Sequence, residues 1–119
     1  MKILLDEQLP VKLKFRFMPE FEVSTVKDEK WLGIKNGDLI KLMLNAGFDI
    51  FITNDQSLGF QQKLGQHKIF FINLNKPSNR YEDVLPILLQ IKSWLLKNES
   101  NIENILISKN FLVHPADFM

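Results

Sequence analysis

The sequence predicts a single α/β domain over residues 1–119 with a mainly parallel sheet. Short apolar segments with strand-like patterning alternate along the chain with segments whose apolar residues recur every three or four positions. The length of 119 residues suits one domain with one core, and 45% hydrophobic and 24% charged residues are ordinary for a globular protein. Strands that alternate with helices predict βαβ units with right-handed crossovers.

The N-terminal part of the chain predicts two strands joined by a short helix. Residues 3–5 are apolar and end at Asp6, which indicates a short buried strand. Pro10 suits the first turn of a helix over residues 10–18, because its missing N–H has no partner there. Apolar side chains recur at four-residue spacing along this helix: Leu9, Leu13 and Phe17. An alternating pattern over residues 21–26 predicts the second strand.

The middle of the chain predicts a loop, a helix and a third strand. The loop covers residues 27–35. Asn36 is a suitable N-cap, and Gly47 suits the C-terminal end of the helix. This helix has an apolar stripe formed by Leu39, Leu42, Met43 and Ala46. The third strand covers residues 49–53, and residues 57–64 are expected to form a loop or a short helix.

The C-terminal part predicts a fourth strand, a long helix and a hairpin. The strand covers residues 68–74, and the amphipathic helix covers residues 81–97. Pro86 lies early in this helix, where it is expected to kink or restart it. Two apolar segments within residues 103–114 predict a terminal hairpin.

Composition excludes several classes of function. Fifteen Lys and Arg against fourteen Asp and Glu give a net charge of +1, so non-specific duplex binding has no basic excess behind it. The absence of cysteine excludes disulfides, thiol nucleophiles and cysteine-bound zinc. No G-x-x-x-x-G-K-[ST] motif is present, so we do not expect a nucleotide triphosphatase. An acid arrives too early for a signal peptide and no apolar run is long enough for a membrane span, so we expect a cytoplasmic protein without membrane contact.

Acidic residues follow two of the predicted strands, where a parallel sheet binds its ligands. Asp6 and Glu7 come directly after the first strand, and Asp55 comes after the third. Asp38 lies in the first turn of the helix that leads into the third strand. Carboxylates that converge without Lys or Arg repel one another, and oxygen ligands favour Mg²⁺ or Mn²⁺. We therefore expect Asp6, Asp38 and Asp55 as metal ligands, and these with Glu7 as the catalytic acids of phosphodiester hydrolysis.

A structural explanation competes with this interpretation. An Asp after a strand is often a turn residue, and an Asp in the first turn of a helix often interacts only with the helix dipole. Trp31 lies in a polar loop beside the expected site, where either core packing or base stacking would suit it.

Several segments together resemble a PIN-like nuclease family of prokaryotes whose members are predicted toxins of toxin–antitoxin pairs. Residues 4–10 read LLDEQLP, similar to the family opening hhDEpLP. Residues 31–40 read WLGIKNGDLI, similar to WxGxKNGxLL, and residues 48–58 read FDIFITNDQSL, similar to FDxhhTxDxNL. Paired glutamines at 61–62 and the segment NRYEDVLP at 79–86 match as well.

The resemblance implies a PIN-like three-layer α/β/α sandwich and a role for each matching residue. Asp6 and Asp55 would bind the metal, with Glu7 and Asp38 as supporting acids. Residues implied on the substrate side are Lys35, Asn36, Thr53, Ser57 and Gln61. Ser57 stands where related PIN-like branches carry a second acid.

The implied activity is cleavage of RNA with Mg²⁺ or Mn²⁺ by a toxin. RNA is the implied substrate and an antitoxin protein the implied partner, with a homodimer as a further option. Two other hypotheses compete with this one. The first is a PIN-like binding module without catalysis, which the Ser57 position favours. The second is a phosphoacceptor receiver domain, but the 20 residues between Asp55 and Lys76 are too few for the elements that it needs there.

Overall fold

The computed structural model describes residues 1–34, 36–54, 69–74 and 76–99. The elements, in chain order, are strand β1 (Lys2–Leu5), the 3₁₀ helix η1 (Val11–Arg16), β2 (Glu22–Thr25), α1 (Asn36–Asn45), β3 (Ile50–Thr53), β4 (Phe70–Asn73) and α3 (Tyr81–Lys97). This order matches the alternation expected from the sequence. The expected loop or helix over residues 57–64 and the hairpin over 103–114 lie outside the described residues.

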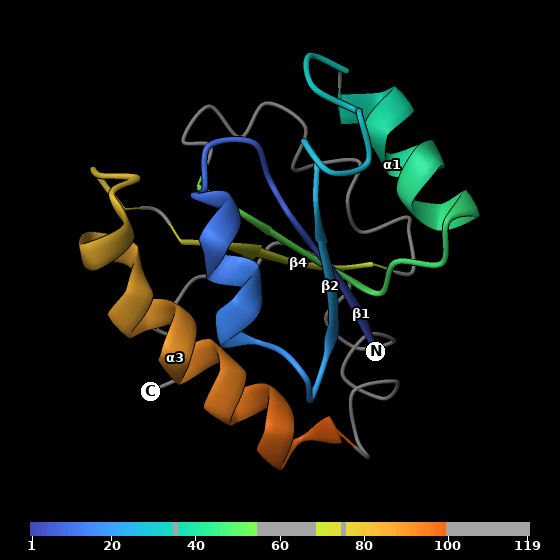
Figure 1. Ribbon diagram of the computed structural model, residues 1–119. Helices are drawn as coiled ribbons and strands as arrows, with labels where there is room; N and C mark the ends of the chain where they lie inside the picture. Colours follow the sequence, from blue (N-terminus) through green and yellow to red (C-terminus); the bar gives the residue numbers. More distant parts are fainter. Residues whose placement is uncertain (35, 55–68, 75, 100–119) are drawn as a thin grey trace.

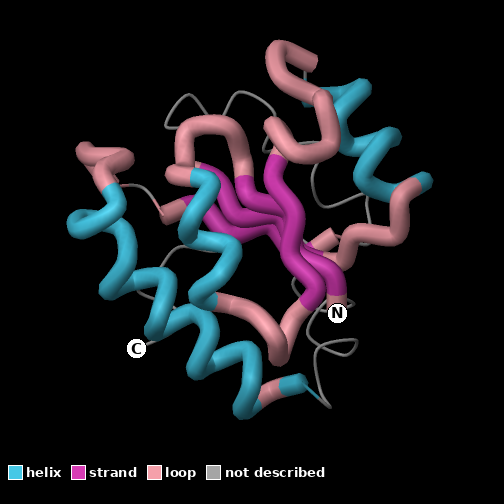
Figure 2. Tube along the Cα trace, viewed as in Figure 1, coloured by secondary structure: helices cyan, strands magenta, loops and turns pink. Residues whose placement is uncertain are grey.

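The four strands form one sheet in the order β2-β1-β3-β4, and every neighbouring pair is parallel. The predicted α/β fold with a parallel sheet is therefore confirmed. The chain leaves β1 in one direction to form β2, then returns past β1 to form β3. The connecting helices η1 and α1 lie on opposite faces of the sheet, as two crossovers of the same hand require (Figure 1). Figure 2 shows the strands as one layer between helices.

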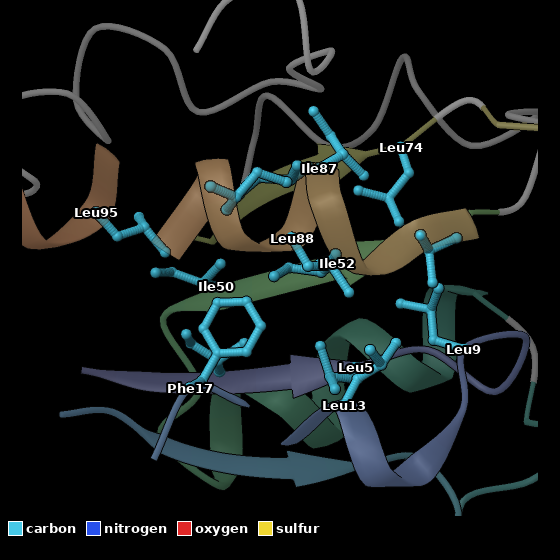
Figure 3. Close-up of a cluster of buried hydrophobic side chains, with 14 of the residues drawn as sticks. Leu5, Leu9, Leu13, Phe17, Ile50, Ile52, Leu74, Ile87, Leu88 and Leu95 are labelled. Atoms are coloured by element: carbon cyan, nitrogen blue, oxygen red, sulfur yellow. The ribbon is translucent and has the colours of Figure 1, made fainter. Parts of the chain in front are cut away.

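Both faces of the sheet are buried, so the protein has two apolar clusters. Ile3 and Leu5 of β1 and Ile52 of β3 pack in the first cluster with η1 and α3. Figure 3 shows Leu88 of α3 close to Ile52 of β3. Leu4 of β1 packs on the opposite face in the second cluster, with α1. Burial on both faces explains why the central strands β1 and β3 are largely apolar runs, whereas the edge strand β2 has an alternating sequence.

The helix between β1 and β2 differs from the expectation. Residues 10–18 were expected to form a helix, and the structure has a six-residue 3₁₀ helix, η1, in which backbone bonds span three residues. Pro10 and Pro19 bracket the segment, and a proline both lacks an N–H and disfavours the α conformation in the residue before it. The short segment therefore forms a tight 3₁₀ helix. Its expected apolar side chains are still buried: Leu9, Leu13 and Phe17.

The two α-helices begin and end close to the expected residues. α3 is one continuous helix through Pro86, whose side chain is exposed, so the expected restart is wrong. α1 ends at Asn45, and Gly47 follows it with a φ of +80°. Gly47 donates a backbone hydrogen bond to Leu44 and Phe48 donates one to Met43, which is the pattern of a Schellman end. Within the described ranges, no helix is both long enough and apolar enough to span a bilayer.

Candidate functional site

Buried polar side chains gather at the carboxyl ends of the strands. Every buried polar or charged residue in the described part of the chain ends a strand or directly follows one: Asp6, Thr25, Thr53, Asn54 and Asn73. Three of them belong to β1 and β3, the two neighbouring strands from which the chain runs to opposite sides of the sheet. Parallel sheets bind ligands at such a reversal point, beyond the carboxyl ends of the strands. The candidate site therefore lies at the ends of β1 and β3.

Asp6 is the charged group of this site and is held by two hydrogen bonds. Its side chain is only 8% exposed. The hydroxyl of Thr53 donates to Oδ2 at 2.6 Å, and the backbone N–H of Glu7 donates to Oδ1 at 2.8 Å. The backbone N–H of Asp6 donates to Ile52 of β3 at 2.9 Å, which fixes the residue at the junction of the two strands. The carboxylate is thus oriented by the sheet itself.

Asp6 is also a carboxylate in an unfavourable environment for its charge. Burial raises the pKa of Asp6 above its ordinary value, and hydrogen bonds from Thr53, the Glu7 backbone and Gln8 offset only part of that rise. The nearby charge of Glu7 raises the pKa of Asp6 further. Among the described residues, no lysine or arginine contributes to this shift. A cation near Asp6 would stabilise its charged form, so the environment suits a metal ligand.

Glu7 and Gln8 extend the site toward its two neighbouring loops. Glu7 is exposed, and its Oε2 lies 3.4 Å from the backbone nitrogen of Gly33, in the loop after β2. The Oε1 atom of Gln8 lies 3.4 Å from both the Thr53 hydroxyl and the backbone nitrogen of Asn54. Because the Thr53 hydroxyl has one proton and Asp6 is closer, that proton belongs to the bond with Asp6. Gln8 therefore links the turn after β1 to the end of β3.

Asn54 joins the end of β3 to the segment before α3. Its Nδ2 group donates to the backbone oxygen of Ser78 at 3.2 Å and to Oδ1 of Asn79 at 2.5 Å. Its Oδ1 atom accepts the backbone N–H of Lys76 at 2.8 Å. Asn54 and Gln8 are not among the site residues expected from the sequence. Their position beside Asp6 and Asp55, next to strand ends, was the signal that could have identified them.

The structure separates the expected site residues into two groups. Asp6, Glu7 and Thr53 come together, whereas Asp38 is exposed in the first turn of α1. In the described part of the chain, no group of three metal-binding side chains forms, so Asp38 does not complete a site with Asp6 and Glu7. Asn36 is the first helical residue of α1, one position inside the place of the expected N-cap. Four expected site residues lie outside the described residues: Lys35, Asp55, Ser57 and Gln61.

From the sequence, Thr53 and Trp31 were each candidates for a contact with substrate, and the structure shows internal contacts for both. Thr53 is fully buried and its hydroxyl bonds to Asp6. Its side chain therefore has no exposed surface for the expected contact with substrate. Trp31 packs against the second apolar cluster, with its ring 5.9 Å from that of Phe48 in an edge-to-face arrangement. Core packing therefore explains Trp31.

Comparison with protein-family models, curated proteins and solved structures found no match for this chain.

Proposed function

We propose that this protein is a PIN-like, metal-dependent ribonuclease that hydrolyses RNA phosphodiester bonds at the carboxyl ends of β1 and β3. The observation that carries the proposal is Asp6, a buried carboxylate at the reversal point of a parallel sheet without a cationic partner among the described residues. The motifs that resemble the PIN-like family supply the choice of RNA as the substrate.

The carboxylate oxygens at the carboxyl ends of the strands would provide part of the coordination shell of a hard divalent cation. Asp6 offers carboxylate oxygens whose two hydrogen bonds leave lone pairs free. Glu7 adds a second, exposed carboxylate beside it. Asp55 is the proposed third acid, two residues after Thr53 in the sequence. Bound Mg²⁺ or Mn²⁺ would supply an activated water and stabilise the leaving oxygen.

The chain's own groups would orient the reacting parts. Thr53 and the Glu7 backbone hold the Asp6 carboxylate in one orientation, so it need not reorganise when a cation binds. Burial keeps water away from Asp6, which strengthens its attraction for a cation. Glu7 lies on the exposed side, where it would bind the cation through water or receive a proton.

A test of the activity uses labelled single-stranded RNA and single-stranded DNA of the same sequence. The purified protein is incubated with each in Mn²⁺, Mg²⁺ or EDTA. We expect cleavage of RNA with either metal and none in EDTA. Cleavage of DNA alone would correct the substrate class, and cleavage that persists in EDTA would exclude the metal-dependent chemistry.

A binding module without catalysis is the second candidate function. The feature that favours it is Ser57, which stands where related PIN-like branches carry a second acid. Such a module would not need metal, so the affinity for Mn²⁺ separates the two candidates. Micromolar Mn²⁺ binding supports the nuclease, whereas a folded chain that does not bind Mn²⁺ supports the module. The toxin role, an antitoxin partner and a homodimer rest on the family resemblance alone and belong to the proposal.

A further inference from the structure

Asn54 has more hydrogen bonds to a distant part of the chain than its place in the proposed chemistry requires. Its side chain is 5% exposed, and both ends of its amide group bind one segment, residues 76–79, through Lys76, Ser78 and Asn79. These residues are 22–25 positions away along the sequence. The three bonds satisfy the donor and the acceptor of the amide together, so Asn54 fits this segment specifically.

The bound segment is ordered by its own contacts as well. The Ser78 hydroxyl donates to Asp83 at 2.7 Å, and the backbone N–H of Arg80 donates to the Ser78 hydroxyl at 3.1 Å. Residues 76–80 are thereby connected to the first turn of α3, which begins at Tyr81. The segment is thus bonded at two points, to Asn54 and to the first turn of α3.

The position of this segment places it beside the candidate site. It follows β4, the strand next to β3, and Asn54 holds it at the carboxyl end of β3. On the other side, the loop after β2 approaches Glu7 through Gly33. Two segments therefore flank the reversal point between β1 and β3. One contacts Glu7, just after β1, and the other contacts Asn54, just after β3.

We infer that Asn54 is a positioning residue that fixes residues 76–80 as the wall of the candidate site on the β4 side, where this segment contacts the phosphates of the nucleic-acid substrate. Lys76 and Arg80 are the exposed cations of the segment, and cations of this kind bind phosphate. Arg80 pairs with Glu82, but both side chains are exposed, so a phosphate competes well for it. The contact with nucleic-acid phosphates rests on the proposed function, whereas the role of Asn54 rests on the geometry alone.

The test combines amide hydrogen exchange with kinetics on the full chain. Asn54→Ala removes all three bonds, and Asn79→Ala removes only one. Asn79→Asp keeps an oxygen acceptor for the Asn54 amide, but its charge would repel a phosphate, so this variant is used for hydrogen exchange only. Asn45→Ala is the matched control, because Asn45 is an exposed asparagine at the end of α1.

We expect the backbone amide of Lys76 to exchange at least about fivefold faster in Asn54→Ala, as loss of one hydrogen bond implies. Amides of β1 and β3 should keep their protection in that variant. With RNA and Mn²⁺, Asn54→Ala and Asn79→Ala should raise KM about fivefold and change kcat by less than about twofold, since binding rather than chemistry is lost. Asn79→Asp should keep the exchange rate of the wild type at Lys76, and Asn45→Ala should keep both that rate and the KM.

Two results would overturn the inference. Unchanged exchange at Lys76 in Asn54→Ala would show that Asn54 does not hold the segment. Faster exchange with unchanged KM in both alanine variants would show that the segment does not contact the substrate. If Asn54→Ala does not fold, Asn79→Ala still gives the KM readout, and Lys76 should exchange faster in it by a smaller factor, because the Lys76 bond to Asn54 remains. A wild type that cleaves no RNA would refute the proposed function instead, and exchange at Lys76, measured without RNA or metal, would still decide the role of Asn54.

Discussion

The Thr53 hydroxyl donates a hydrogen bond to Asp6. We therefore expect that replacing this fully buried hydroxyl changes the stability of the protein through the charge of Asp6. Thr53→Val replaces the hydroxyl by a methyl group of similar size, so the substitution leaves no cavity. It removes the 2.6 Å bond to Oδ2 of Asp6 and leaves that carboxylate with one of the two donors that orient it. The Thr53 bond is also the largest contribution that lowers the pKa of Asp6, so its loss raises that pKa further.

The expected magnitude follows from the short bond and its burial. A hydrogen bond to a charged group contributes about 1.5–3 kcal/mol to stability. The new methyl group contributes about 0.8 kcal/mol in return because it is buried. We therefore expect Thr53→Val to lower the free energy of unfolding by about 1–2 kcal/mol at pH 7. At pH 4 the loss should be smaller, because a protonated Asp6 makes a weaker, neutral hydrogen bond.

Urea denaturation followed by tryptophan fluorescence measures this difference. Thr53→Ser is the matched control, because it keeps the hydroxyl and loses only a methyl group. Its cost should be the same at pH 4 and pH 7, whereas the cost of Thr53→Val should grow with pH. Equal, pH-independent costs for the two variants would refute the coupling between Thr53 and the charge of Asp6.

Three further predictions follow from single features. Because the folded protein binds the Asp6 proton more tightly than the unfolded chain does, ionised Asp6 lowers stability at neutral pH, and this cost disappears as the pH falls toward 3.8. Asp6→Asn should thus gain stability relative to the wild type between pH 4 and pH 7, and a constant difference in urea midpoints would contradict this. Gly47→Ala should lower the free energy of unfolding by about 1 kcal/mol through the positive φ alone, since nothing lies within 4 Å of an added Cβ; an unchanged midpoint would exclude a strained left-handed Ala. Ser57→Asp should tighten Mn²⁺ binding by restoring an acid where related PIN-like branches carry one, and an unchanged calorimetric titration would show that position 57 does not face the metal.

The fold was predictable because its patterns are local. Leu4 and its neighbours are an apolar run that suits a strand buried on both faces, and Gly47 marks a helix end that needs a positive φ. The helix predicted over 81–97 has the bounds of α3, whose buried side chains are Val84, Ile87, Leu88, Ile91 and Leu95. The 3₁₀ form of η1 was not predictable, because the four-residue spacing of Leu9, Leu13 and Phe17 is typical of an α-helix, and only Leu13 lies within η1.

The site was predictable only where strand order did not matter. Asp6 could be placed at a strand end from the sequence, because the apolar run ends there. The contact between Asp6 and Thr53 depends on β1 and β3 being neighbours, and strand order is a non-local property. The same reason explains Asn54, whose partners are more than 20 residues away. Asp38 was expected near Asp6 because its helix leads into β3, but its side chain is exposed in the first turn of α1.

The central claim is that Asp6 binds the metal that cleaves RNA, and one pair of variants tests it. Asp6→Asn keeps the shape of the side chain, and the Thr53 hydroxyl can accept from the new amide, so the fold should persist. Glu22→Gln is the control, because Glu22 is an exposed acid at the opposite, N-terminal end of β2.

Mn²⁺ titration and cleavage of labelled RNA are measured on the wild type and both variants, with circular dichroism as the check of folding. The account predicts that folded Asp6→Asn loses Mn²⁺ binding and RNA cleavage together, while Glu22→Gln keeps both. An Asp6→Asn protein that binds Mn²⁺ and cleaves RNA like the wild type would contradict it.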